Sequence, residues 1–360
     1  MTDLFLAQTP VNLLISAALA IAETTTAEPH LIACSRTDGE EAWTRAASTS
    51  QHWPFSTTTF LDRRLKGLSP WSKWRRIRTN IQLTRHQVRQ LTPDRIWFFN
   101  DQFPSVQAAC VEAKRVRPDA RRIFIDEGLS SYGIRPFPVP GAIPTAIRRL
   151  ALGHWWEELP LNGTSSHADE ARLLYPEFAN PAIRPPRQPL GRELFDQPQI
   201  KRLLADLVPP VDKELTTLVF TGRSSLTPDR ERLRQQYVDI IAPLAAAGET
   251  IGLKAHPAEE SDDPFDLGKT LPVICLPRHT PSEVFVMHFR QTLRCVVGDG
   301  SSALMTARWL LPDADIVSCS TTANEALSAA DRQLLDLLRN IDIRVGTPAD
   351  AVQETPLPDD

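Results

Sequence analysis

Two adjacent carboxylates follow the apolar run "RIFID" at residues 122–126 and precede a glycine. Asp126 and Glu127 would lie side by side where a short strand ends, and Gly128 permits the positive φ of a tight turn. Such a turn can present one carboxylate as a general base, with a pKa raised by its neighbour or by a dry site. The alternative is an ordinary turn or helix cap, where acidic residues and glycine are common.

A lysine and a histidine mark the end of another strand-like run, residues 250–255, in the second half of the chain. In "GLKAHP", Pro257 favours an extended backbone at His256, and Lys254 lies two residues earlier, on the same face of an extended chain. A histidine at this position can donate to a phosphate or exchange a proton near neutral pH. The alternative is a histidine with only a structural role in an exposed loop.

A third motif, "VVGDGSSALMTARWL", combines a strand, a glycine-rich turn and a helix that opens with Ser301 and Ser302. Free backbone N–H groups, the helix dipole and two hydroxyls favour a bound phosphate there. The motif lacks the P-loop lysine and does not match G-x-G-x-x-G. The alternative is a plain serine N-cap.

Two single residues could complete a nucleotide site. Glu283 opens a predicted helix in "HTPSEVF", where its carboxylate could accept hydrogen bonds from a ribose diol; otherwise it is an ordinary acidic residue in a first helical turn. Gly222 follows a strand-like run in "TGRSS", where it could line the same site or only make a turn.

The elements that must position these residues are short apolar runs that alternate with segments of helical length. This alternation predicts an α/β fold with parallel sheets covered on both faces. The predicted strands are residues 4–7, 30–34, 96–99, 122–126, 217–222, 250–255, 273–276, 295–298 and 315–319.

The proline-rich stretch at residues 175–195 separates the two series of strands and predicts a linker. We therefore expect two doubly wound, Rossmann-like domains that face a cleft, with domains at 1–185 and 186–345 and a tail at 346–360. In such sheets ligands bind beyond the carboxyl ends of the strands, where all the motifs above are predicted to lie.

The overall composition narrows the classes of partner. The net charge of −4 and the pI near 6.1 predict no nucleic-acid partner. The five cysteines are widely spaced and form no C-x-x-C pair, which indicates a reducing compartment and no zinc site. Asp3 and Pro10 argue against a signal peptide. The sequence contains no run of about 20 apolar residues, so we expect no transmembrane helix. We therefore expect a cytoplasmic protein.

Residues 61–95 are locally basic, with ten Lys or Arg against two Asp and a local net charge of +8. Trp71, Trp74, Ile77 and Ile81 have the spacing of an amphipathic helix. This segment could contact the inner membrane peripherally or hold an anionic acceptor. The alternative is a solvated basic helix whose apolar stripe packs on its own domain.

Taken in chain order, the D-E-G, H-P and S-S motifs resemble those of the bacterial GT-B-type sialyltransferases and polysialyltransferases. The opening "LFLAQTPVNLLIS" at residues 4–16 is similar to the family's first strand and its T-P turn into a helix. Glu283 lies 27 residues after His256 and 18 before Ser301, in the region where these enzymes place a ribose-binding glutamate.

The resemblance implies a GT-B-like fold and a role for each motif residue. The N-terminal domain would bind the acceptor and the C-terminal domain the CMP-sugar. Asp126 or Glu127 would deprotonate the acceptor hydroxyl and His256 would assist departure of the CMP phosphate; we prefer Asp126, although the alternation of strand side chains could equally favour Glu127. The remaining roles are Ser301 and Ser302 on the phosphate, Glu283 on the ribose, and Gly222, Lys254 and Pro257 around the nucleotide.

The expected activity is an inverting transfer of sialic acid, or a related nonulosonate, from a CMP-sugar to a glycan of a bacterial surface polysaccharide or lipooligosaccharide. No metal and no cofactor are expected, because basic groups and helix N-terminal amides can stabilise the leaving phosphate. The alternatives are another CMP-releasing transferase, acting on CMP-Kdo or CDP-glycerol, and a non-catalytic carbohydrate-binding subunit. The D-E-G motif favours the sialyltransferase-like group.

Overall fold

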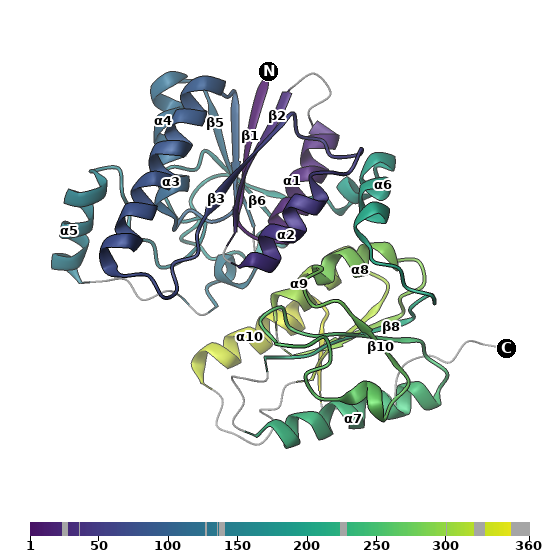
Figure 1. Ribbon diagram of the computed structural model, residues 1–360. Helices are drawn as coiled ribbons and strands as arrows, with labels where there is room; N and C mark the ends of the chain where they lie inside the picture. The colour runs from purple at the N-terminus through teal and green to yellow at the C-terminus, as the bar shows by residue number, and fades with distance from the viewer. Residues whose placement is uncertain are drawn as a thin grey trace. The chain divides into compact units, whose positions relative to one another are not determined.

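Two parallel sheets organise the chain, one in each of two structural units (Figure 1). The computed structural model describes residues 1–23, 28–35, 37–126, 128–134, 136, 141–223, 229–299, 301–319 and 328–346. The units are Met1–Asp206 and Leu207–Asp360. The predicted fold class, α/β with two doubly wound Rossmann-like domains, is confirmed.

The first unit contains a seven-stranded parallel sheet in the order β3-β2-β1-β4-β5-β6-β7. Its strands are β1 (Thr2–Ala7), β2 (Glu28–Ser35), β3 (Thr57–Asp62), β4 (Arg95–Phe98), β5 (Arg121–Ile125), β6 (Glu170–Leu173) and β7 (Arg187–Pro189). The central strands are continuous apolar runs because both of their faces are covered. Phe5 of β1, for example, has no exposed surface and stacks on Trp97 of β4, with 5.6 Å between ring centroids.

Helices cover both faces of this sheet: α1 and α2 lie on one face, and α3 and α4 on the other (Figure 1). The helices are α1 (Pro10–Glu23), α2 (Asp38–Ala47), α3 (Pro70–Leu91), α4 (Pro104–Val116), α5 (Ala142–Leu152) and α6 (Pro198–Leu207), with 3-10 turns η1 (Leu129–Tyr132), η2 (Pro176–Phe178) and η3 (Arg192–Asp196). The turn into α1 is closed reciprocally, since Asn12 Oδ1 accepts from the Thr9 N–H (3.1 Å) and Thr9 Oγ1 accepts from the Asn12 N–H (3.2 Å).

The second unit contains a six-stranded parallel sheet in the order β10-β9-β8-β11-β12-β13. Its strands are β8 (Thr217–Phe220), β9 (Ile251–Lys254), β10 (Val273–Leu276), β11 (Cys295–Gly298), β12 (Asp315–Cys319) and β13 (Arg344–Gly346). Its helices are α7 (Arg230–Ala246), α8 (Ser282–His288), α9 (Ser302–Leu310) and α10 (Ala329–Asn340), with a 3-10 turn η5 (Leu267–Lys269). Figure 1 shows α7 on one face of this sheet and α8 and α9 on the other.

All nine predicted strands are present, with ends shifted by at most two residues. Four further strands, β3, β6, β7 and β13, were not predicted, because they are short or carry polar residues and gain their strand conformation from a neighbour in the sheet. The first unit extends to Asp206, rather than to residue 185, because β7 pairs with β6 and η3 packs on α1 in the segment that was predicted to be a linker. Of the predicted tail, residues 347–360 lie outside the described part of the chain.

The basic segment forms α3, and its apolar stripe divides between two environments. Ile81 is buried and Trp74 and Ile77 are half-buried, whereas Trp71 is 73% exposed. Among the described residues, no helix is long and apolar enough to cross a membrane.

Candidate functional site

The carboxylate of Asp126 lies inside the first unit, directly after β5, with no exposed surface. It accepts hydrogen bonds from the backbone N–H groups of Gly128 (2.9 Å) and Leu174 (3.2 Å) and from the Tyr132 hydroxyl. Gly128 has φ 117°, as the turn requires. Burial raises the pKa of Asp126, and these donors oppose the shift. Asp126 therefore joins the ends of β5 and β6 and shapes the turn.

This geometry argues against Asp126 as the general base, because its oxygens are already hydrogen-bonded and none of the residue reaches solvent. The other carboxylate of the pair, Glu127, lies outside the described residues. The two side chains were alternatives in the sequence, and the burial of Asp126 shifts our preference to Glu127.

A second buried carboxylate, Asp101, was not identified from the sequence. It lies three residues beyond the end of β4 and is almost fully buried; its oxygens accept from the N–H groups of Gly163 (3.0 Å) and Ser165 (2.9 Å). Burial raises the pKa of Asp101 as it does that of Asp126. The available signal was an aspartate within a few residues of the end of an apolar strand, at two neighbouring strands.

In the second unit the sheet order brings three of the predicted motifs together. β9, β8 and β11 are neighbours, and Lys254, Phe220 and Gly298 at their carboxyl ends occupy one row of the parallel register. The H-P motif follows the first of these ends, Gly222 the second, and the S-S motif the third. Segments that are distant in the sequence thus form one edge of one sheet.

His256 is exposed at this edge, and its ring has a defined tautomer. The Ala258 N–H donates to Nδ1 at 3.1 Å, so in the neutral ring Nε2 carries the proton. Desolvation of the ring, assisted by the positive charge of Arg223, lowers the pKa of His256. The ring is therefore neutral near pH 7 and offers Nε2–H as a donor. Pro257, which follows, is also exposed.

Lys254 is only 3% exposed, and its ammonium group is used inside the unit. Nζ donates to the carbonyl oxygens of Ala255 (2.8 Å) and Arg278 (3.0 Å), which ties the end of β9 to the segment after β10. Burial lowers the pKa of Lys254 to about 8, against the attraction of Glu283. Lys254 was expected to line the nucleotide site, but in this structure it supports the loop that carries His256.

Glu283 is half-buried in the first turn of α8, next to the loop that Lys254 holds. The Ser282 hydroxyl donates to its Oε2 at 3.1 Å. Desolvation raises the pKa of Glu283, and the nearby positive charge of Lys254 opposes the shift. A desolvated carboxylate with remaining acceptor capacity suits the hydroxyls of a ribose.

Ser301 occupies the N-cap position of α9 with extended backbone, φ −135° and ψ 162°, but its side chain makes no capping hydrogen bond. The N-cap serines of α3 and α10, Ser69 and Ser328, both accept from a backbone N–H of the first turn. The Ser301 hydroxyl is thus not used as a cap, and the exposed Ser302 begins the helix beside it. Both hydroxyls and the first amides of α9 can donate to an anion.

Gly222 is held at the same edge by Tyr237 of α7, whose hydroxyl accepts from the Gly222 N–H at 2.6 Å. A Cβ at Gly222 would lie 3.2 Å from Oδ2 of Asp299, so a side chain there would crowd the turn after β11. Tyr237 and Asp299 were not identified from the sequence; a tyrosine within an amphipathic helix carries no signal of this role.

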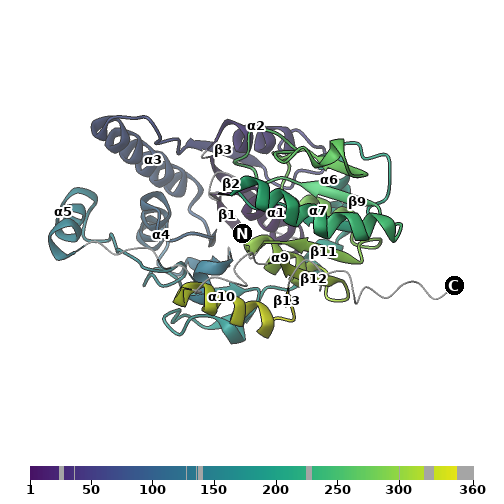
Figure 2. The same cartoon turned by 90° about the horizontal axis from the view of Figure 1, so that it is seen from below.

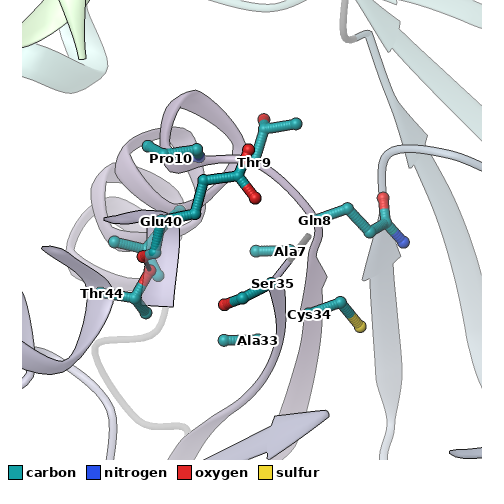
Figure 3. Close-up of a pocket in the computed structure, with 10 residues that line it drawn as sticks. Ala7, Gln8, Thr9, Pro10, Ala33, Cys34, Ser35, Glu40 and Thr44 are labelled. Atoms are coloured by element: carbon teal, nitrogen blue, oxygen red, sulfur yellow. Dashed lines mark hydrogen bonds between the residues drawn. The ribbon is translucent and has the colours of Figure 1, made fainter. Parts of the chain in front are cut away.

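A small pocket lies elsewhere, at the carboxyl ends of β1 and β2 beside the start of α1 (Figure 3). It is lined by residues that include Thr9, Ser35, Glu40 and Thr44, and its volume of about 10 Å³ suits roughly one water molecule. It is too small for a sugar; it lies at the T-P turn of residues 4–16 and contains no residue of the D-E-G, H-P or S-S motifs. In the part of the chain that is described, no three His, Cys, Asp or Glu side chains gather as a metal site; metal independence stays a prediction.

Comparison with known proteins supports the fold. No protein-family profile and no curated protein sequence matches the chain. The structure is similar to that of an alpha/beta-galactoside alpha-2,3-sialyltransferase from Photobacterium phosphoreum, with a TM-score of 0.56 and 11% identity over 97% of this chain and 98% of that one.

Two other kinds of enzyme are similar to the same degree. A UDP-GlcNAc 2-epimerase from Methanocaldococcus jannaschii, in complex with UDP-GlcNAc and UDP, has a TM-score of 0.54 and 11% identity over 100% and 96% of the two chains. UGT73P12 from Glycyrrhiza uralensis has a TM-score of 0.54 and 11% identity over 96% and 81%. The chain therefore has the GT-B fold that these proteins share, and at this identity the likeness extends to the fold alone.

Proposed function

We propose that the protein is a glycosyltransferase that moves sialic acid, or a related nonulosonate, from a CMP-sugar to a glycan of a bacterial surface polysaccharide or lipooligosaccharide. The observation that carries the proposal is the edge of the second sheet. There, the His256 ring, the Gly222 turn and the uncapped Ser301 follow three neighbouring strands of a GT-B-fold unit.

In this proposal the second unit binds the leaving group. The CMP phosphate would accept hydrogen bonds from Ser301, Ser302 and the first amides of α9, and from Nε2–H of His256. As the bond between the sugar's anomeric carbon and the phosphate oxygen breaks, the electron pair stays on the phosphate. The donors stabilise that charge more in the transition state than in the ground state, which lowers the barrier.

The first unit would supply the base. The acceptor oxygen forms the new bond to the anomeric carbon while its proton passes to a carboxylate, and a single displacement of this kind inverts the configuration. We assign this proton transfer to Glu127 and give Asp126 the role of holding the turn. Glu283 would bind the ribose, and Pro257 and Gly222 would line the nucleotide. Lys254 would hold the loop that carries His256 in place.

The proposal is tested by CMP release from CMP-Neu5Ac in the presence of EDTA, with and without a mixture of glycan acceptors. We expect release by the wild-type protein and a loss of roughly 10²-fold or more for His256→Ala, the size typical of one lost donor to a developing charge. His86→Ala, which removes an exposed histidine from α3, is the matched control and should retain full activity.

Parallel reactions with CMP-Kdo, CDP-glycerol and UDP-GlcNAc separate the competing functions. UDP-GlcNAc is included because the epimerase and this chain share a fold. Turnover of UDP-GlcNAc without CMP-sugar turnover would refute the proposal. CMP binding with no transfer from any of these donors would favour a non-catalytic binding subunit.

A further inference from the structure

The helix α5 (Ala142–Leu152) presents its apolar side to solvent. Ile143 is 75% exposed, Ile147 62% and Leu150 88%. Their spacing of four and three residues places them on one face of the helix. In both views α5 lies at the edge of the first unit, outside α3 and α4 (Figures 1 and 2). An ordinary surface helix buries such a face.

The opposite, polar face of α5 carries two arginines that contact the segment directly after the helix. Arg148 forms an ion pair with Glu158, with N–O distances of 3.0 and 3.1 Å, and Nε of Arg149 donates to the Trp156 carbonyl oxygen at 3.2 Å. Nε1 of Trp156 donates to the same Glu158 carboxylate at 3.0 Å. Turning the apolar face toward this segment would break these contacts, which therefore favour the outward orientation.

Cationic side chains of α3 lie near the segment that follows α5. α5 contains no acidic residue, whereas Glu157 and Glu158 follow it. α3 contacts the same segment, because the Arg85 guanidinium lies over the Trp155 ring, 5.1 Å from its centroid. Trp71, Arg75 and Arg78 are exposed on α3 with the same spacing of four and three residues. Among the described residues, neither Arg75 nor Arg78 takes part in an ion pair.

We propose that α5 inserts the face formed by Ile143, Ile147 and Leu150 into an anionic lipid bilayer, while Arg75 and Arg78 attract the protein to that surface. An apolar helical face beside tryptophan and arginine suits the boundary between headgroups and acyl chains. A second copy of the chain is a poorer occupant, because a two-fold interface would bring the exposed arginines of two copies together. The inference adds an inserting helix to the basic segment 61–95 and does not depend on glycosyl transfer.

The test is flotation of the full chain with two kinds of vesicle, one of equimolar phosphatidylglycerol and phosphatidylcholine and one of phosphatidylcholine alone. We expect binding to the anionic vesicles, reduced roughly tenfold or more when Ile143, Ile147 and Leu150 are all replaced by Ser, because binding scales with the buried apolar area. Leu83→Ser removes another exposed leucine, from α3, and should bind as the wild type does. Arg75→Gln with Arg78→Gln should weaken binding at low salt and have little effect at high salt.

Equal binding by the wild type and the triple Ser variant would overturn the proposal. So would a wild-type protein that does not float with anionic vesicles but forms a dimer in solution that the triple variant loses, since the face would then belong to a second copy. Unchanged unfolding curves for the triple variant would show that a loss of binding is not a loss of folding.

Discussion

The two carboxylates of the D-E-G motif should respond to substitution in opposite ways. In Asp126→Ala, the N–H groups of Gly128 and Leu174 lose their acceptor inside the unit, and the Tyr132 hydroxyl loses its partner. An unpaired buried donor costs about 1–3 kcal/mol. The hydroxyl can rotate toward another partner, so the two backbone groups set the scale, roughly 2–6 kcal/mol of unfolding free energy.

Glu127→Gln should leave stability almost unchanged and lower kcat by roughly 10²–10⁴-fold, the usual contribution of a general base. Asp126→Asn should lie between the wild type and Asp126→Ala in stability, because the amide oxygen keeps one acceptor and the amide NH₂ faces a donor.

Urea unfolding followed by tryptophan fluorescence measures the loss of stability in Asp126→Ala, because all tryptophans except Trp309 lie in the first unit. A loss of this size corresponds to a decrease of roughly 4–24 °C in Tm for a unit of this length. The rate of CMP release measures the loss of kcat in Glu127→Gln. The reasoning is refuted if Asp126→Ala unfolds as the wild type does, or if Glu127→Gln keeps full kcat while Asp126→Asn loses it.

Three further outcomes follow from the second unit. Ser301→Ala should leave stability unchanged and raise the KM for the donor, because this serine does not cap its helix. Ser328→Ala removes a side-chain cap and should cost about 1 kcal/mol of unfolding free energy while transfer stays intact. The reverse pattern would contradict the proposed phosphate site. Because the pKa of Lys254 is lowered to about 8, the unfolded chain binds more protons above that pH, and stability should rise from about pH 8 towards the ordinary lysine pKa near 10.5; Lys254→Met should flatten that rise in pH-dependent unfolding. Tyr237→Phe removes the acceptor of the Gly222 N–H and should destabilise the unit by about 1 kcal/mol, measured by thermal unfolding, with a weaker donor affinity; an unchanged Tm and KM would show that this contact does not hold the turn.

The strands were predictable where burial is a local property of the sequence. An apolar run such as residues 122–126 is buried on both faces wherever it lies in a parallel sheet, so its strand conformation follows from its own composition. β7 has the sequence Arg187–Pro189 and no apolar pattern, and it is a strand because β6 offers it a pairing edge. The boundary of the first unit was displaced for the same reason.

The sequence predicted which strand ends carry the residues of the candidate site, but it did not predict the direction in which their side chains point. The order of the motifs placed His256, Gly222 and Ser301 at carboxyl ends, and the sheet order then made those ends neighbours. Whether a serine caps its helix, or whether a lysine points outward, depends on atoms that the local sequence does not contain. Lys254 is turned inward by the Arg278 carbonyl, 24 residues away.

The sequence by itself determined the alternation of strands and helices, the strand ends that carry polar motifs, and the amphipathic patterns, because each arises from residues within a few positions of one another. Only the tertiary structure decided which face or side chain turns inward. Leu174, 48 residues away, donates to the buried carboxylate of Asp126, and the Arg278 carbonyl, 24 residues away, accepts from the buried Lys254. A pattern creates a face or a pair of carboxylates, whereas its direction is set by hydrogen-bond partners that folding brings from elsewhere in the chain.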